Sequence, residues 1–248
     1  MLASLAAQPT QPLETIVVDQ STPRYDLEPF EGLVHLHDTS INGSSQARNR
    51  GIERATGDII VFFDDDAVLE SDCIAEVAAC YAARPDVIGV QCAVTNPWDR
   101  DPFFWYRAST LIFEHGFFNQ RDCRRKGLRV PRLIDGLASS YRRSLFERER
   151  FDEALVAYAL AEDWDITKRA ARHGALLVAE KARVRHECSP HNRLDTRNYL
   201  EMRVKNVLYL YEKLGAARDP RNRMWKAWWL LGESLRTFKL DLRERSHP

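Results

Sequence analysis

Long apolar runs are absent from this 248-residue sequence, and no stretch approaches the roughly 20 residues that a membrane-spanning helix requires. The formal net charge is zero, from 36 basic and 36 acidic residues, which argues against a dedicated nucleic-acid-binding protein. The five cysteines are scattered and include no C-x-x-C pair, so the sequence indicates neither a zinc site nor a disulfide framework. Free thiols suit a reducing compartment, and we therefore expect a cytoplasmic protein.

What the sequence does contain is an alternation of strand-like and helical runs, the pattern of an α/β domain. Hydrophobic residues make up 44% of the chain, enough for a substantial core. The expected strands are 15–18, 33–36, 59–63, 87–94 and 133–141, followed by two short ones near 175–178 and 182–186. The span 97–131 fits neither pattern, and an irregular stretch of that length is usually functional or mobile.

Helical patterns lie between and after these strands; one begins at Ser71, another opens at Glu162 and ends at Gly174, and three more bear on the domain outline. The first runs from about 44 to 55, and we expect Ala47, Gly51 and Ala55 on its packed face. The second covers about 196–214, and the third follows Asp219-Pro220, a capping acid with proline at the first helical position. The third helix aligns apolar residues on one side, namely Met224, Trp228, Leu231, Leu235, Phe238 and Leu242. We predict an α/β domain over residues 1–190 and a C-terminal helical extension over 191–248.

Three consecutive aspartates, Asp64, Asp65 and Asp66, stand at the end of the apolar strand 59–63. Three like charges repel one another unless solvent, or a cation with its ligand, neutralises them. Ligands of open α/β sheets bind at the carboxyl ends of the strands, and carboxylate oxygens suit Mg²⁺ or Mn²⁺ shared with substrate phosphates. The triplet predicts a divalent-metal site for a diphosphate-bearing substrate, with a polar turn before the next helix as the alternative.

A second acidic pair, Glu162-Asp163, opens a predicted helix. The helix dipole favours acids at this end, which is a purely structural explanation. The functional alternative is a general base that takes a proton from a hydroxyl nucleophile. Further along, His186 ends a predicted strand, where a lone histidine is more often structural than a metal ligand.

These segments, in this order, resemble family 2 glycosyltransferases of the GT-A fold. The matching segments are Ile16-Val-Val-Asp-Gln-Ser-Thr22, Ala47-Arg-Asn-Arg-Gly51, Gly57-Asp-Ile-Ile-Val-Phe-Phe-Asp-Asp-Asp66, Phe151-Asp-Glu153, Glu162-Asp163 and Arg183-Val-Arg-His186. The resemblance covers roughly residues 1 to 215 and implies a Rossmann-like domain with a mixed central sheet. It also implies an inverting transfer of a sugar from a nucleoside-diphosphate donor to an acceptor hydroxyl.

By this resemblance, Asp19 contacts the nucleobase or ribose of the donor. The aspartate triplet contains the family's D-x-D motif, in which Asp66 is the most direct ligand of Mn²⁺ or Mg²⁺. Asp64 and Asp65 lie nearer the ribose, and Asp64 is also counted as a metal ligand. His186 completes the metal shell or touches the diphosphate.

The resemblance also assigns the acidic pair. Asp163 is the base that deprotonates the acceptor, and Glu162 orients the acceptor or the base. A cation would stabilise charge on the leaving diphosphate while the base activates the nucleophile from the opposite side of the sugar.

One departure from the family concerns the amino terminus. Family members usually begin with a strand that lines the nucleotide pocket, whereas residues 1–8 here resemble the helix after that strand. We therefore expect the first nucleotide-binding strand to be missing. Two alternatives stay open: a sugar nucleotidyltransferase, although no Gly-rich phosphate loop is seen, and a catalytically inactive nucleotide-sugar-binding protein.

The expected partners are a nucleoside-diphosphate sugar and a glycan or lipid-linked acceptor of polysaccharide or cell-envelope biosynthesis. The stretch 121–132 has six basic residues and one acid, and either holds a phosphate or is solvated surface. Residues 218–245 carry eight basic and four acidic residues. This last helix could lie peripherally on an anionic inner membrane face, or pack on the catalytic domain or a second copy.

Overall fold

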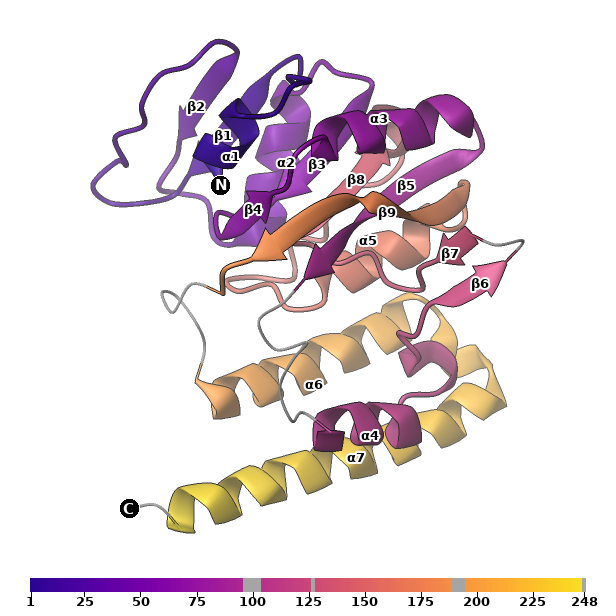
Figure 1. Ribbon diagram of the computed structural model, residues 1–248. Coiled ribbons are helices and arrows are strands. Elements are labelled where there is room, and N and C mark those ends of the chain that lie inside the picture. The colour runs from indigo at the N-terminus through magenta and orange to yellow at the C-terminus, as the bar shows by residue number, and fades with distance from the viewer. Residues whose placement is uncertain (96–103, 126–127, 189–194, 247–248) are drawn as a thin grey trace. The chain divides into compact units, whose positions relative to one another are not determined.

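The computed structural model describes residues 1–95, 104–125, 128–188 and 195–246 (Figure 1). The chain forms two compact units. The first, here the α/β unit, comprises Met1–Asp99 and Arg121–Ser189, and the second, the helical unit, comprises Arg100–Gln120 and Pro190–Pro248. The segment 100–120 therefore groups with the C-terminal helices although it lies within the α/β part of the sequence.

The α/β unit is built on a five-stranded mixed sheet. Its strands are β3 (Ile59–Phe63), β4 (Ala67–Leu69), β5 (Val87–Thr95), β8 (Ala138–Arg142) and β9 (Ala175–His186). They lie in the order β3-β8-β5-β9-β4, in which β5 and β9 are parallel and the other neighbours are antiparallel. The predicted α/β class with a mixed central sheet is thus confirmed.

Two smaller sheets accompany this one. The strands β1 (Thr15–Asp19) and β2 (Leu33–His37) pair in parallel, and β6 (Cys123–Arg125) pairs antiparallel with β7 (Leu128–Val130). Within the described residues, β1 has no ladder partner besides β2, and β3 has none besides β8. The first sheet and the five-stranded sheet are therefore not joined by a ladder.

The helices of the α/β unit are α1 (Leu2–Ala6), α2 (Ser44–Arg54), α3 (Cys73–Ala83) and α5 (Glu162–Ala170). Successive residues of β9, Leu176 and Leu177, are both buried but belong to different apolar clusters, as side-chain alternation along a strand requires. Val77 of α3 lies in the cluster of Leu177, and Ile166 of α5 lies in that of Leu176. Helices α3 and α5 thus cover opposite faces of the sheet (Figure 1).

The prediction of two short strands near residues 175–186 was wrong, because β9 is one strand of 12 residues. Its pairing with β5 shifts register between Cys92 and Ala93, whose partners on β9 are Ala179 and Arg183. The extra residues of β9 are accommodated at this irregularity, so the strand continues through a sequence that reads as a break.

The helical unit contains α4 (Phe104–Phe113), α6 (Thr196–Lys213) and α7 (Pro220–Ser246). The expectation that 97–131 is irregular was wrong in its described parts, because they include α4 and the β6–β7 hairpin. Helix α4 packs on α7, where Gly232 leaves room for the ring of Phe113. The predicted start of α7 is confirmed, and the Asp219 carboxylate accepts a hydrogen bond from the backbone N–H of Arg221 at 2.8 Å.

The core of the helical unit combines stacked rings with buried charge. Trp229 stacks on Phe118 at 4.8 Å between ring centroids. Arg203 of α6 donates to Glu114 at 2.8 Å, and Arg236 pairs with Glu233 on α7. The side of α7 that faces its own unit is therefore the one that carries Trp229 and Glu233. The predicted apolar stripe of this helix, as far as Phe238, lies on its exposed side.

Candidate active site

The most deeply buried face of α2 is not the one predicted from its small residues. Its buried residues are Ser45, Asn49 and Ile52, whereas Ala47, Gly51 and Ala55 are only partly buried. The small-residue side also packs, because Gly51 lies against Val18 of β1 and Ala55 borders a buried apolar cluster, but the more deeply buried side is the one where Asn49 has its hydrogen-bonding groups satisfied. This change of face also turns Arg48 inward.

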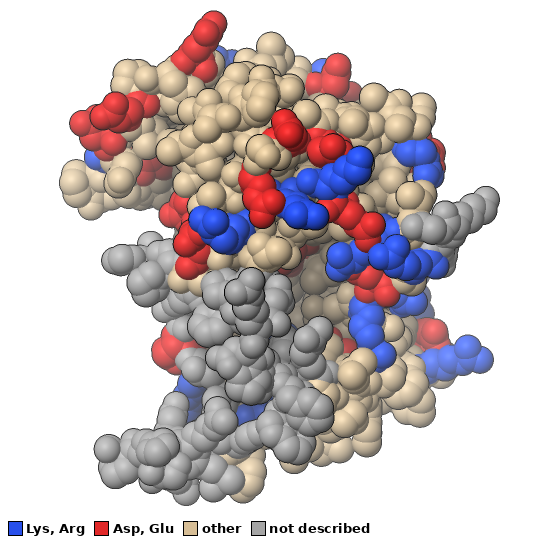
Figure 2. Space-filling view, viewed as in Figure 1, with Lys and Arg blue, Asp and Glu red and all other residues tan. Residues whose placement is uncertain are grey.

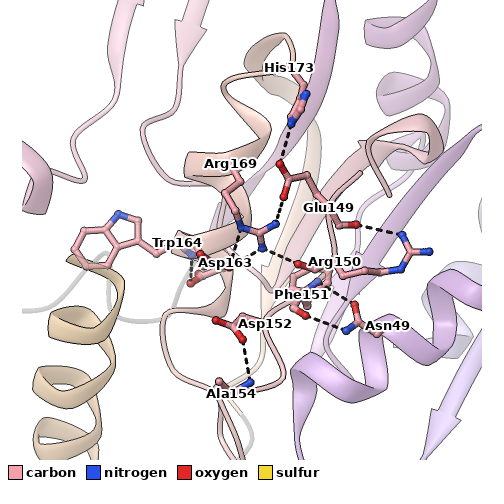
Figure 3. Close-up of polar contacts among 11 residues, drawn as sticks. Asn49, Glu149, Arg150, Phe151, Asp152, Ala154, Asp163, Trp164, Arg169 and His173 are labelled. Atoms are coloured by element: carbon pink, nitrogen blue, oxygen red, sulfur yellow. Dashed lines mark hydrogen bonds and ion pairs between the residues drawn. The ribbon is translucent and has the colours of Figure 1, made fainter. Parts of the chain in front are cut away.

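Asn49 joins α2 to the segment Phe151-Asp-Glu153. Its amide donates to the carbonyl of Phe151 at 2.9 Å and accepts from the backbone N–H of Phe151 at 2.9 Å (Figure 3). It also donates to the Glu153 carboxylate at 2.8 Å. The side chain thus makes the same pair of hydrogen bonds that a residue of a neighbouring β-strand would make. Two sequence segments about 100 residues apart therefore form one structural element.

Arg48 lies where the two acidic motifs meet. The antiparallel register of β3 and β8 places the carboxyl end of β3 beside the turn before β8, and the Asp64 N–H donates to the Leu137 carbonyl at 3.1 Å. The Arg48 guanidinium contacts Asp64 Oδ1 at 3.1 Å, the Gly136 carbonyl at 3.2 Å and the Glu162 carboxylate. One buried cation therefore links the end of β3 to the start of α5.

Gly136 has a steric role at this junction. A Cβ atom on Gly136 would lie 2.9 Å from both the Arg48 guanidinium and the Glu162 carboxylate. These side-chain ends are held in a mutual ion pair, so they have little freedom to move away. Only glycine fits at this point without displacing the pair.

The acidic pair Glu162-Asp163 forms the first turn of α5, as predicted. Asp163 accepts hydrogen bonds from the N–H of Trp164 at 2.7 Å and of Gly136 at 3.3 Å. Burial, together with the charges of Glu162 and Asp135, raises the pKa of Asp163 well above its usual range. Burial also raises the pKa of Glu162, with Arg48 acting in the opposite direction. A carboxylate with a raised pKa is better matched to proton transfer near neutral pH.

The remainder of α5 is fixed by a separate ion-pair group (Figure 3). Arg169 binds Asp165 on its own helix, with its Nε atom 3.0 Å from the carboxylate, and also pairs with Glu149. His173 contacts the other oxygen of Glu149 at 2.8 Å. Asp165, which follows Asp163 by two residues, therefore helps to anchor α5.

The loop before α5 contains unusual backbone. Ala157, Ala159 and Ala161 all have positive φ, between 49° and 75°, which costs a non-glycine residue about 1–2 kcal/mol each. Gly43, at the start of α2, bridges to Ala157, and a Cβ there would lie 2.2 Å from the Ala157 carbonyl oxygen. Close packing against α2 holds this loop beside the acidic pair.

The structure brings Asp66 and His186 together. Ala67 and His186 are paired in the β4–β9 register, and His186 Nε2 lies 3.1 Å from Asp66 Oδ2. Among the described residues no group of three or more His, Cys, Asp or Glu is arranged for a metal ion. One carboxylate and one imidazole are still donors that suit Mn²⁺ or Mg²⁺ when the substrate supplies further oxygens. Asp64 is turned toward Arg48, and Asp65 is exposed.

Asp19 is a buried acceptor at the end of β1. Its carboxylate accepts from the hydroxyl and N–H of Ser21, from the N–H of Tyr25 at 2.9 Å and from His35 at 3.0 Å. Burial alone would raise the pKa of Asp19, but these hydrogen bonds outweigh it and hold the pKa below its usual range. Asp19 therefore stays ionised and organises the loop after β1, and the described hydrogen bonds of its carboxylate all come from residues 21–35.

The basic stretch 121–132 is partly paired in its described residues. Arg124 contacts Glu180 at 2.9 Å, and Arg129 contacts Asp122 at 2.6 Å. Lys126 lies outside the described residues. Figure 2 shows acidic and basic atoms interspersed across the middle of the face in view, with no large region of one sign there. These contacts favour the solvated-surface alternative for this stretch.

Comparison with solved structures identifies the fold of the chain. The mannosyltransferase PcManGT from Pyrobaculum calidifontis, solved with GDP-Man and Mn²⁺, matches 93% of this chain and 68% of that chain, with a TM-score of 0.56 and 18% identity. TarS (residues 1–349) from S. aureus, solved with UDP-GlcNAc, matches 93% of this chain and 66% of that chain, with a TM-score of 0.55 and 18% identity. At such identities the likeness shows the fold alone, which is the GT-A fold.

The sequence comparisons then place the chain in a family. Residues 1–149 match the model described as glycosyl transferase family 2, so the chain belongs to this family. The Haloferax volcanii glucosyl-dolichyl phosphate glucuronosyltransferase is 34% identical over 110 residues, which are 41% of this chain and 35% of that protein. The chain thus spans about a third of the length of this curated relative. The predicted fold and family are confirmed.

Proposed function

We propose that this protein is an inverting, metal-assisted glycosyltransferase that moves a sugar from a nucleoside-diphosphate sugar to an acceptor hydroxyl. The observation that carries the proposal is the Arg48 junction, which holds Asp64 and Glu162 on one guanidinium with Asp163 next in the chain. Donor and acceptor chemistry would then meet at one site. A nucleotidyltransferase would need no carboxylate of raised pKa aligned with a donor site.

On the donor side, Asp66 and His186 would hold Mn²⁺ or Mg²⁺, with Asp64 and Asp65 near the ribose and Asp19 near the base. The bound cation would neutralise the charge that develops on the leaving diphosphate. Because the Asp19 carboxylate already accepts four hydrogen bonds, it would act on the base by fixing the loop after β1. Membership of the family and the nucleotide sugars bound by proteins of the same fold support this assignment.

On the acceptor side, Asp163 would take the proton of the attacking hydroxyl. The acceptor oxygen forms a bond to the anomeric carbon while the bond from that carbon to the diphosphate oxygen breaks. A single displacement of this kind inverts the configuration at the anomeric carbon. Glu162, held by Arg48, would position Asp163 and the acceptor.

The acceptor we propose is a lipid-linked or glycan hydroxyl in cell-envelope or polysaccharide synthesis. The name of the Haloferax volcanii relative, which contains a dolichyl phosphate, supports a lipid-linked acceptor. The reaction would take place in the cytoplasm, at or near the inner membrane face.

Matched variants of α5 test the proposal. Asp163→Asn should lower Mn²⁺-dependent sugar release from a panel of nucleotide sugars by ~10²–10⁴-fold, while the donor still raises the melting temperature. Asp165→Asn should lower the melting temperature, because it weakens the Arg169 anchor, but leave turnover of the folded enzyme near wild type. Full turnover by Asp163→Asn would refute the base assignment.

The same assay separates the two alternatives. Pyrophosphate exchange without sugar release would identify a nucleotidyltransferase. A donor-dependent thermal shift with neither reaction would identify a nucleotide-sugar-binding protein.

A further inference from the structure

Helix α7 presents a continuous apolar stripe on the exposed side of the helical unit. The stripe has helical 4-3-4-3 spacing, and its described members are between 40% and 63% exposed, namely Met224, Trp228, Leu231, Leu235 and Phe238. Leu242, the last member predicted from the sequence, has a side chain outside the described set. Contiguous apolar surface of this kind on a folded protein marks an interaction site.

Helix α4 widens the stripe. Trp228 donates its indole N–H to the carbonyl of Ile112 at 2.8 Å, and its ring lies 5.1 Å from that of Phe113. Leu111 and Ile112 are themselves 55% and 52% exposed. Because the indole N–H is bonded within the protein, the ring can leave water without losing a hydrogen bond. We call these seven residues, Leu111, Ile112, Met224, Trp228, Leu231, Leu235 and Phe238, the α4–α7 face.

The exposed charges of α7 between residues 220 and 238 are all positive. Arg221 and Arg223 are exposed in the first turns of the helix. Between residues 220 and 238 the only acid is Glu233, which is 3% exposed and paired with Arg236 in the interior. From residue 220 to residue 238, α7 therefore offers solvent apolar and basic groups without an exposed acid.

A second copy of α7 is a poor occupant of this face. Partner choice in paired helices depends on complementary charges that flank the apolar seam. Up to Phe238 the flanking positions are uncharged, namely Trp225, Ala227, Gly232 and Ser234, and the next two, Lys239 and Asp241, have side chains outside the described set. Arg221 precedes Trp228 by seven residues, so it continues the seam itself and would face an identical charge in a parallel pair. A lipid surface requires no such side-chain match.

We propose that the α4–α7 face docks on the surface of an anionic lipid bilayer, with α7 lying in the plane of the interface. Helices that bind in this way combine Trp, Phe and Leu on one face with basic residues and a low overall hydrophobicity. No helix in the described ranges is long and apolar enough to cross a bilayer. The inference stands apart from the proposed transfer reaction, since it rests on the helical unit and its test measures lipid binding.

The test is sedimentation of the full chain with vesicles of phosphatidylcholine, with or without phosphatidylglycerol. The wild-type chain should sediment with the mixed vesicles, and less so at high salt, because screening weakens attraction to anionic lipid. The triple variant Leu231→Ser/Leu235→Ser/Phe238→Ser should lose binding about tenfold or more. The matched control, Leu13→Ser/Val156→Ser, removes exposed apolar side chains from the α/β unit and should bind as wild type.

Charge provides a second arm. Arg221→Glu should weaken binding to the mixed vesicles selectively, whereas Arg148→Glu, an exposed arginine of the α/β unit, should not. Thermal melts confirm that each variant is folded. Equal sedimentation of the wild type and the triple variant would overturn the proposal. So would an absence of vesicle binding together with a dimer, seen by light scattering, that the triple variant converts to monomer.

Discussion

Replacing Arg48 by Met should destabilise the α/β unit in a pH-dependent manner. The Arg48 and Glu162 side chains are 11% and 10% exposed, so the substitution leaves Glu162 buried without its cation. Breaking a buried ion pair by removing one partner costs ~3–5 kcal/mol. The Asp64 contact adds little, since that carboxylate is 46% exposed and screened by solvent. Against a typical total of ~5–15 kcal/mol, we expect a loss of about 3 kcal/mol at neutral pH.

The sign of the pH dependence follows from Glu162. Burial raises its pKa and Arg48 opposes that rise, so the variant should have a still higher pKa in the folded state. The folded variant then binds a proton that the unfolded chain releases, and its stability increases as pH falls. The deficit relative to wild type should therefore be smaller at about pH 5 than at about pH 7.

Urea unfolding at the two pH values measures this deficit. Arg50→Met is the matched control on the same helix, because Arg50 is half exposed and its substitution should change stability by less than about 0.5 kcal/mol. A loss no larger than that of Arg50→Met, or a loss that is identical at both pH values, would refute the assigned role of Arg48.

Three further outcomes are expected. Gly136→Ala should keep the fold but displace the Arg48–Glu162 pair. We expect a drop in turnover at a near-normal melting temperature, and unchanged turnover would contradict the steric role of Gly136. As pH increases, kcat/KM should rise through a pKa above the ordinary aspartate value of ~3.9, because Asp163 must lose its proton to act as a base. A rise at the ordinary value would contradict the role of Asp163 as the base. His186→Ala should raise the Mn²⁺ concentration needed for nucleoside-diphosphate binding by roughly tenfold or more, and an unchanged requirement would remove His186 from the metal site.

The residues that the sequence analysis missed at the site are Arg48, Asn49 and Gly136. The first two lie in the segment Ala47-Arg-Asn-Arg-Gly51. The sequence analysis identified this segment but drew its structural expectation from the small residues in it. Small-residue spacing indicates close packing, but it does not distinguish a helix face of alanine from one that buries a hydrogen-bonded amide. Gly136 carries no signal in a single sequence, since its role depends on two side chains that reach it from 88 and 26 residues away.

By itself the sequence determined the strands near 15–18, 33–36 and 59–63, the acidic residues that follow β3 and those that open α5, and the family. These features depend on local periodicity and on short sequence motifs, and a single stretch of chain is enough to specify each of them. The tertiary structure decided what each element faces. Helix α4 forms where the sequence looked irregular because α7 packs against it, and the stripe of α7 is exposed because Trp229 and Glu233 fill the interior instead. A helical pattern defines a face, but only its neighbours decide whether that face is buried, since burial is a property of contacts between distant segments.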